Sequence, residues 1–199
     1  DNGYEQACGK ARQMSGLKSS TVHIAYPGNL YGTGCRQIDV GGEQTVVEEL
    51  YPVSLVKTLE LNIKVTGGED VRSVNLSGRL TGVSSQVHIP TGKALFDTPA
   101  FMSFEPEQAD PGVYTSSLNL FGLSGGTAGS EPVELYLTLT LKDGKEITSL
   151  TNITGEVGDA FETSVSAYIV LDLEVTYDEV NGATITITGW KEGIGEVGN

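Results

Sequence analysis

Four segments of the sequence alternate apolar and polar residues with a period of two, and this pattern restricts the fold more than any other feature. Apolar side chains take every second position in 59–65, 133–141, 169–175 and 185–187. Successive side chains of a β-strand point to opposite faces of its sheet, so each segment has one core face and one solvated face. Parallel strands buried on both faces would read as continuous apolar runs, so the pattern predicts antiparallel sheets.

Two dipeptides next to these segments are typical of tight β-hairpins. Asp143-Gly144 is expected to fold the strand before it onto 145–151, and Asn181-Gly182 is expected to fold 168–178 onto 183–190. Both dipeptides are favoured in type I′ turns, in which the two central residues have positive φ. The sequence therefore predicts two hairpins with type I′ turns.

The remaining apolar runs complete an all-β chain. Strands are predicted at 83–89 and 113–121, whereas 71–80 fits either a helical turn or a short strand with a bulge at Gly78. No part of the sequence keeps a helical period of apolar residues for three turns. About seven short strands with almost no helix are typical of a sandwich of two packed antiparallel sheets.

Residues 1–50 differ from the rest of the chain because they are polar at the start and show little periodicity. Candidate strands lie only at 22–26 and 44–50. Fifty residues are too few to close a second sandwich. The predicted organisation is a C-terminal β-sandwich domain at 51–199, preceded by residues 1–50 as either an N-terminal arm or the remnant of a first sandwich domain.

The composition and the missing motifs exclude several classes of function. The chain has 12 basic and 26 acidic residues and a formal charge of −14, which repels phosphate backbones, so nucleic acid is not an expected partner. The Gly-rich segment 122–129 (GLSGGTAG) lacks the Lys-Ser/Thr of a phosphate-binding loop. His23 and His88 are interpreted as exposed strand residues. We therefore predict no catalytic, cofactor-binding or metal-binding residue, no cofactor and no enzymatic activity.

Three local features have two interpretations each. Cys8 and Cys35 form either a disulfide or two isolated thiols. The acidic segment 178–182 comes nearest to a calcium loop but fits a hairpin better. Trp190, at the end of the last strand, is predicted as a core plug in preference to a platform on which a sugar stacks.

Four segments resemble, in order and spacing, those of the fimbrillin-related cell-surface proteins of the Bacteroidales, the group of fimbrial subunits and fimbrial anchors. They are 25–31 (AYPGNLY), 51–57 (YPVSLVK), 76–83 (LSGRLTGV) and 185–190 (ITITGW). The resemblance covers residues 22–195. It implies a transthyretin-like β-sandwich fold, export as a lipoprotein to the outer membrane, and a place at the cell surface in fimbriae that serve cell adhesion.

The resemblance also implies the partners. These are other fimbrial subunits, joined by β-strand addition, and the outer membrane, reached through an N-terminal lipid not present in this chain. The tail 191–199 has three glycines and two apolar residues three apart, which suits it poorly to filling a neighbour's groove. We therefore expect a non-enzymatic anchor or assembly-limiting accessory subunit of surface fimbriae. The alternative is an outer-surface glycan-binding β-sandwich protein.

Overall fold

The computed structural model describes residues 6–14, 21–33, 49–67, 75–125, 131–163 and 168–192, together with the single positions 42, 45 and 47. Over these residues the chain forms fifteen strands and one helix. In chain order they are β1 (Cys8–Lys10), β2 (Val22–His23), β3 (Tyr31–Gly32), β4 (Val53–Ser54), β5 (Lys57–Thr66), β6 (Asn75–Thr81), β7 (Gln86–His88), β8 (Lys93–Leu95), β9 (Ala100–Phe104), β10 (Glu107–Asp110), β11 (Val113–Leu120), β12 (Glu134–Thr140), β13 (Glu146–Asn152), α1 (Thr154–Thr163), β14 (Tyr168–Asp178) and β15 (Gly182–Glu192). No helix in this part of the chain is long and apolar enough to cross a membrane.

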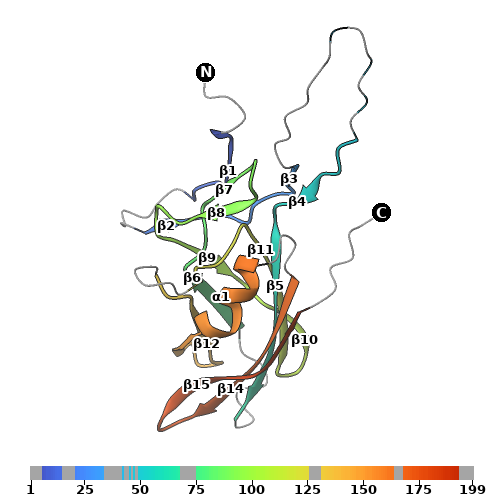
Figure 1. The fold of residues 1–199 in the computed structure, drawn as a ribbon. Helices are drawn as coiled ribbons and strands as arrows, with labels where there is room; N and C mark the ends of the chain where they lie inside the picture. The colour runs from blue at the N-terminus through green and yellow to red at the C-terminus, as the bar shows by residue number, and fades with distance from the viewer. Residues whose placement is uncertain are drawn as a thin grey trace.

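Two five-stranded sheets pack face to face and build the main body. The first sheet has the order β10-β11-β5-β14-β15, and the second sheet has the order β13-β12-β6-β9-β2. Apolar side chains of both sheets form one buried cluster between them. The predicted all-β sandwich is confirmed. Figure 1 shows the β14–β15 hairpin at one end of it and the small sheet β1-β7-β8 at the other.

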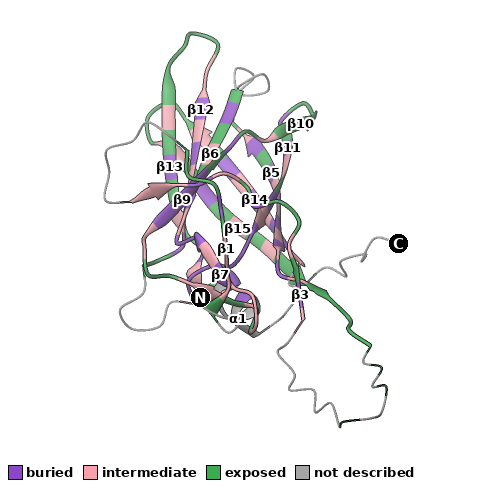
Figure 2. Cartoon of the chain, turned by 90° about the horizontal axis from the view of Figure 1, so that it is seen from above, coloured by how far each residue is buried: buried purple, intermediate pink, exposed green. Residues whose placement is uncertain are grey.

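The period-two segments bury the face that the sequence predicts. Leu141 and Ile187, at the margins, are only half-buried. The other predicted inward residues of the last three segments are buried: Val133, Leu135, Leu137, Leu139, Ile169, Leu171, Leu173, Val175 and Ile185. Figure 2 shows the resulting alternation of buried and more exposed positions along β5, β12 and β14. The inward register of these strands is therefore confirmed.

Both predicted hairpins are present, but their turn type is not the predicted one. β12 pairs with β13, and β14 pairs with β15, antiparallel in each case. Gly144 and Gly182 have positive φ (84° and 80°), whereas Asp143 and Asn181 do not, so the type I′ prediction is wrong. Three residues separate the paired ends of each hairpin, and each turn has positive φ at one glycine rather than at two adjacent residues.

A purely antiparallel arrangement is also wrong at two places. β14 runs parallel to β5 in the middle of the first sheet, from Tyr168 beside Thr58 to Thr176 beside Thr66. β2 runs parallel to β9. Parallel strands read as continuous apolar runs only where both faces of their sheet are buried. Because the outer face of the first sheet is polar, β5 and β14 alternate although they are parallel.

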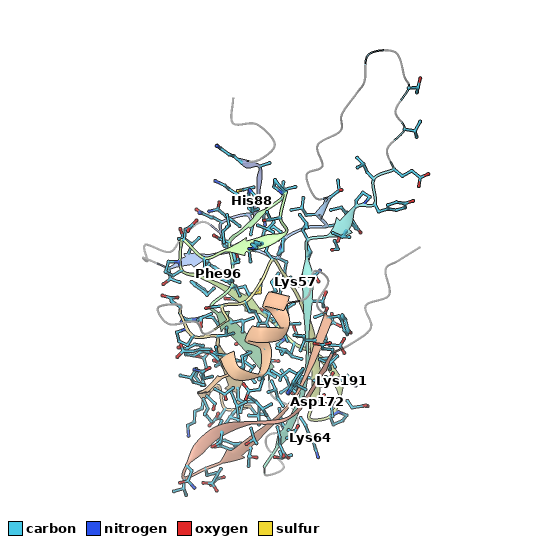
Figure 3. The ribbon with its side chains drawn as sticks, viewed as in Figure 1. Lys57, Lys64, His88, Phe96, Asp172 and Lys191 are labelled. Carbon is cyan, nitrogen blue, oxygen red and sulfur yellow. The ribbon has the colours of Figure 1, made fainter. Side chains whose placement is uncertain are left out.

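The helix α1 is absent from the sequence prediction. Val157 and Phe161, four residues apart, are buried in the core together with Ile153, which precedes the helix. Two apolar positions are too few to reveal a helical period. Lys57, a buried lysine, holds the helix, because its Nζ donates to the backbone carbonyl of Phe161, and Figure 3 shows Lys57 next to α1.

The ambiguous segment 71–80 forms strand β6 from Asn75 onward, and 71–74 lies outside the described residues. The pairing of β6 runs through Gly78 without a shift on either side, so the alternative with a bulge there is wrong. A Cβ at Gly78 would collide with the ring of Phe104, which lies against the strand. Gly78 therefore makes room for an aromatic core residue.

Several short strands lie at the edge of the main sheets or outside them. Of the predicted strand 83–89, only β7 forms a ladder, while Val83 makes an isolated bridge to Leu123. Within 44–50, positions 45, 47, 49 and 50 are outside any strand, and the others lie outside the described residues. β1 pairs with β7, β2 with β9, and β3 with β4. Strands from residues 1–50 therefore pair with strands of 51–199.

Candidate functional site

In the described part of the chain, the acidic residues are not gathered at a metal site. Among the described residues, no group of three or more His, Cys, Asp and Glu side chains is placed to hold a metal ion. In the candidate calcium segment, Asp178 Oδ1 accepts hydrogen bonds from the backbone N–H groups of Asn181 (2.8 Å) and Val180 (2.9 Å). These bonds hold the pKa of Asp178 below its usual value. Asp178 thus stabilises the hairpin turn, as the hairpin interpretation expects.

The two histidines are half-buried, so the prediction of exposed strand residues is wrong. The ring of His23 stacks on Phe101, with centroids 4.6 Å apart and planes 4° from parallel. His88 Nδ1 lies 2.7 Å from Thr91 Oγ1 in the turn between β7 and β8. Each histidine has a local packing or hydrogen-bonding role that covers part of its ring.

Trp190 is 50% exposed, so its prediction as a core plug is wrong. Trp190 lies on β15, opposite Leu171 of β14. β15 is the edge strand of the first sheet, so one side of it has no neighbouring strand. The pairing shifts by one residue between Asp172 and Leu173, and Thr188 Oγ1 donates to the backbone carbonyl of Asp172 at this bulge. An edge position beyond a bulge leaves the indole at the margin of the core.

Some predictions fall on residues outside the described part of the chain. These are the partner thiol Cys35, the end of the loop at 126–129, and the tail 193–199. Cys8 is half-buried in β1, and its thiol donates to the carbonyl of Gln6 at 3.6 Å. The pairing of the two cysteines and the properties of the tail stay predictions.

The outer face of the first sheet consists of polar side chains that bond to one another across strands. Asn62 Nδ2 donates to Asp172 Oδ1 at 2.9 Å. The other cross-strand pairs are Thr58 with Asn119 at 3.1 Å, Thr66 with Thr176 at 3.3 Å, and Tyr168 with Glu60. The hydrogen bond to Glu60 raises the pKa of the Tyr168 phenol, and desolvation adds to the shift. Figure 3 shows Asp172 with Lys64 and Lys191 on this part of the molecule.

The outer face of the second sheet carries a different arrangement, which we call the aromatic stripe. It consists of His23, Phe101, Arg79, Tyr136 and Leu150, from β2, β9, β6, β12 and β13. The Arg79 guanidinium lies over two rings, 4.9 Å from the centroid of Phe101 and 4.7 Å from that of Tyr136. Phe101 is 7% exposed because His23 and Arg79 cover it. A row of ring contacts therefore crosses the four strands β2, β9, β6 and β12, and Leu150 of β13 lies opposite Tyr136 at its end.

The phenol of Tyr136 is fixed at the side of Arg79. Its hydroxyl donates to Glu134 Oε2 at 2.8 Å. This bond is the main cause of a raised pKa for Tyr136, and the positive charge of Arg79 opposes it with a smaller effect. No carboxylate in the described part of the chain forms an ion pair with Arg79, whose side chain is exposed. Arg79 is thus held by rings rather than by a counter-charge.

Next to the stripe lies a depression of about 570 Å³, which we call the outer groove. Ser77 and Ser103 line it as short side chains of β6 and β9, and Arg79 and Tyr136 line it from the stripe. Tyr26 and Glu105 complete the lining from the side of β9. Burial raises the pKa of the Tyr26 phenol. The outer groove combines hydroxyl groups, two phenols, one cation and one carboxylate.

The sequence prediction did not identify the outer groove. In the sequence, Arg79 is only a member of the segment 76–83, and Tyr136 is only an outward residue of an alternating strand. Their meeting depends on the pairing of β12 with β6, which places Tyr136 opposite Arg79. The available signal is that Arg79 and Tyr136 are large side chains at outward strand positions. Short polar residues are as common at such positions, so this signal does not identify a site.

No family model matches the sequence, and no curated protein is significantly similar to it. Among solved structures, a "putative adhesin" from Bacteroides ovatus has a TM-score of 0.56 at 17% identity and covers 92% of this chain and 67% of that chain. A "putative cell adhesion protein" from Bacteroides fragilis has a TM-score of 0.50 at 11% identity and covers 72% of this chain and 48% of that chain. The chain thus spans two thirds of the first protein and about half of the second. It has the fold of these Bacteroides proteins, and the resemblance predicted from the sequence is confirmed at the level of the fold.

Proposed function

We propose that the protein is a non-enzymatic component of bacterial surface fimbriae, an anchor or assembly-limiting accessory subunit that contacts neighbouring subunits by β-strand addition. The fold supports this role, because the two solved structures that share it are named for adhesion and cell adhesion. The same proposal places the protein at the cell surface, attached to the outer membrane by an N-terminal lipid outside this chain.

The observation that carries strand addition is the way β2 completes the second sheet. β2 is two residues long and lies at the edge of that sheet, parallel to β9. Ile24, just after it, is 2% exposed and belongs to the core. The segment is held by backbone bonds from Val22 N to Pro99 O (2.8 Å) and from Ile24 N to Phe101 O (2.9 Å). A short edge segment that supplies a core side chain is the kind of element that an added strand replaces.

The accessory role rests on the other end of the chain. β15 is paired with β14 from Gly182 to Glu192, so the last described strand is part of the sandwich. A subunit that donates its last strand to a neighbour would need that strand detached. The pairing of β15 therefore supports a subunit that does not donate β15 to a neighbour.

Mass spectrometry of native surface fibres tests this function. We expect the chain to be present at far lower stoichiometry than the main subunit. Absence from the fibres, or a content equal to that of the main subunit, would contradict the proposal.

Strand acceptance is tested with a fluorescent peptide of residues 20–27. We expect it to bind the full chain carrying Ile24→Gly more tightly than the unchanged chain, because the substitution weakens the resident segment. A peptide of the same composition in scrambled order is the control. Equal binding of both peptides would contradict acceptance at β9.

A further inference from the structure

We propose that the outer groove binds an acidic saccharide, whose carboxylate is held by Arg79 and whose hydroxyl groups bond to the short polar side chains of the second sheet. This binding site goes beyond the assembly role and does not depend on it. Assembly is assigned to the edge of β9 and to β2, whereas the groove lies on the outward face of β12, β6 and β9.

The guanidinium of Arg79 is a hydrogen-bond donor that is oriented before a ligand binds. Phe101 and Tyr136 contact its guanidinium at 4.9 and 4.7 Å from their centroids. A guanidinium has five N–H donors, and the Arg79 side chain also bonds to Tyr136, so the remaining donors are available to a ligand. A planar fork held in place loses little entropy when it binds a carboxylate through two parallel hydrogen bonds.

The charge of the chain favours a ligand with a single negative charge. Arg79 forms no ion pair with any of the described carboxylates, although the protein has 26 acidic residues and a formal charge of −14. The positive charge therefore has no carboxylate partner in the described part of the chain. The acidic surroundings repel a multiply charged phosphate or sulfate more strongly than a single carboxylate.

The lining of the groove favours a saccharide over a peptide. Ser77, Ser103 and Thr138 offer hydroxyl groups, and Glu105 offers an acceptor for the hydroxyls of a sugar. Tyr26 adds an exposed ring against which the apolar face of a sugar can pack. The backbone groups of β12, β6 and β9 bond to one another beneath these side chains, so a peptide has no free strand edge to pair with on the floor.

The test is calorimetric titration of the full chain with matched pairs of saccharides. The pairs are sialyllactose with its methyl ester, and galacturonic acid with its methyl ester, so the members of each pair differ in one negative charge. We expect the acidic member of at least one pair to bind at least about tenfold more tightly than its neutral partner. Equal affinities within both pairs, or no binding of either acidic member at millimolar concentration, would overturn the proposal.

Variants locate the site. Arg79→Met keeps a side chain of similar length without the charge and is expected to lose at least about tenfold in affinity for the acidic saccharide. Arg79→Lys keeps the charge but not the planar fork and is expected to bind with intermediate affinity. Lys64→Met is the matched control, because it removes one exposed positive charge from the first sheet, and it is expected to bind like the unchanged protein. Saccharide binding that survives Arg79→Met, or that is lost equally in Lys64→Met, would overturn the assignment.

Two further measurements keep the result interpretable. Ser103→Phe fills the floor of the groove from an exposed position opposite Arg79, and it is expected to abolish binding even if Arg79→Met unfolds the chain. An oligo-aspartate peptide serves as the second class of ligand. If it binds as tightly as the acidic saccharide and with the same dependence on Arg79, the site recognises carboxylates of peptides and the saccharide proposal is wrong.

Discussion

The two outer faces of the sandwich differ in the partners of their charged side chains. On the first sheet, donors and acceptors of neighbouring strands bond to one another, as Asn62 does with Asp172 and Tyr168 with Glu60. On the second sheet, Arg79 lies between two rings and has no carboxylate partner among the described residues. The fold constrains mainly the inner faces, which pack in one core. The outer faces are free to differ, and a ligand is expected where a charge has no partner.

The largest expected effect concerns the inner faces, where the two sheets should be equivalent. Leu61 of β5 and Leu137 of β12 are both fully buried in the common core. Leu61→Ala and Leu137→Ala are each expected to lower the free energy of unfolding by about 2–5 kcal/mol, because each leaves a cavity. Chemical denaturation measures the loss. Val180→Ala, at a position 90% exposed in the β14–β15 turn, is the control with little expected effect.

If one of the two leucine variants lost less than about 1 kcal/mol, the sheets would not share one core of equal packing. The difference between the two sheets would then include the packing of their inner faces and would not be limited to their outer faces.

A second prediction concerns Gly78, the position of the second sheet at which a side chain is excluded. Gly78→Ala places a methyl group against the ring of Phe104 and is expected to cost about 1–3 kcal/mol of unfolding free energy. The matched control is Gly155→Ala in α1, where a Cβ meets nothing within 4 Å and where alanine favours the helix by up to about 1 kcal/mol. Thermal unfolding of both variants shows whether each substitution lowers or raises the stability. Equal stability of both variants would mean that Phe104 moves aside freely.

The sheets could be predicted from the sequence because their signal is local. Alternation in 133–141 and 169–175 fixes which side chains face inward, and a glycine after Asp143 or Asn181 marks a turn. The choice of partner strand is not local. The parallel pairing of β14 with β5 joins residues 110 positions apart, such as Asn62 and Asp172, and no residue pattern in either strand records it.

The candidate site was missed for the same physical reason. Arg79 and Phe101 are brought together through the pairing of β6 with β9, which sets Thr81 opposite Phe101 and leaves Arg79 diagonal to it. Trp190 shows the opposite error, because an aromatic residue at the end of an apolar run was assigned to the core. Its exposure depends on β15 being an edge strand, which is a property of the sheet order and not of the strand.

A third prediction compares one side-chain pair from each outer face by double-mutant cycles. For Arg79→Met with Tyr136→Leu, we expect a coupling of about 0.5–1 kcal/mol from the contact of the cation with the ring. For Asn62→Ala with Asp172→Ala, we expect about 0.2–1 kcal/mol from the cross-strand hydrogen bond. Free energies of unfolding in denaturant supply both values. A coupling of zero for Asn62 and Asp172 would contradict the description of the first face as bonded across its strands.

The smallest expected effect distinguishes the faces by the ionisation of two tyrosines. Tyr136 and Tyr168 each donate to a carboxylate, Glu134 and Glu60, and this bond raises the pKa of each phenol. A raised pKa means that the folded protein favours the neutral phenol. The contribution to stability is therefore fully present below the unfolded pKa of about 10 and is lost as pH rises through the folded pKa. Glu134→Gln and Glu60→Gln are each expected to lower the pKa of their own tyrosine.

Arg79 separates the two tyrosines, because its charge lowers the pKa of Tyr136 and has no counterpart at Tyr168, whose pKa is raised by every group that acts on it. Arg79→Met is therefore expected to raise the pKa of Tyr136 further and to leave that of Tyr168 unchanged. Site-resolved NMR titration of the two phenols measures both values in one sample. Lys64→Met, on the first sheet, is the control that should leave Tyr136 unchanged. A shift of Tyr168 as large as that of Tyr136 would mean that Arg79 acts through the overall charge of the protein, and its place between the two rings would then not distinguish the second face.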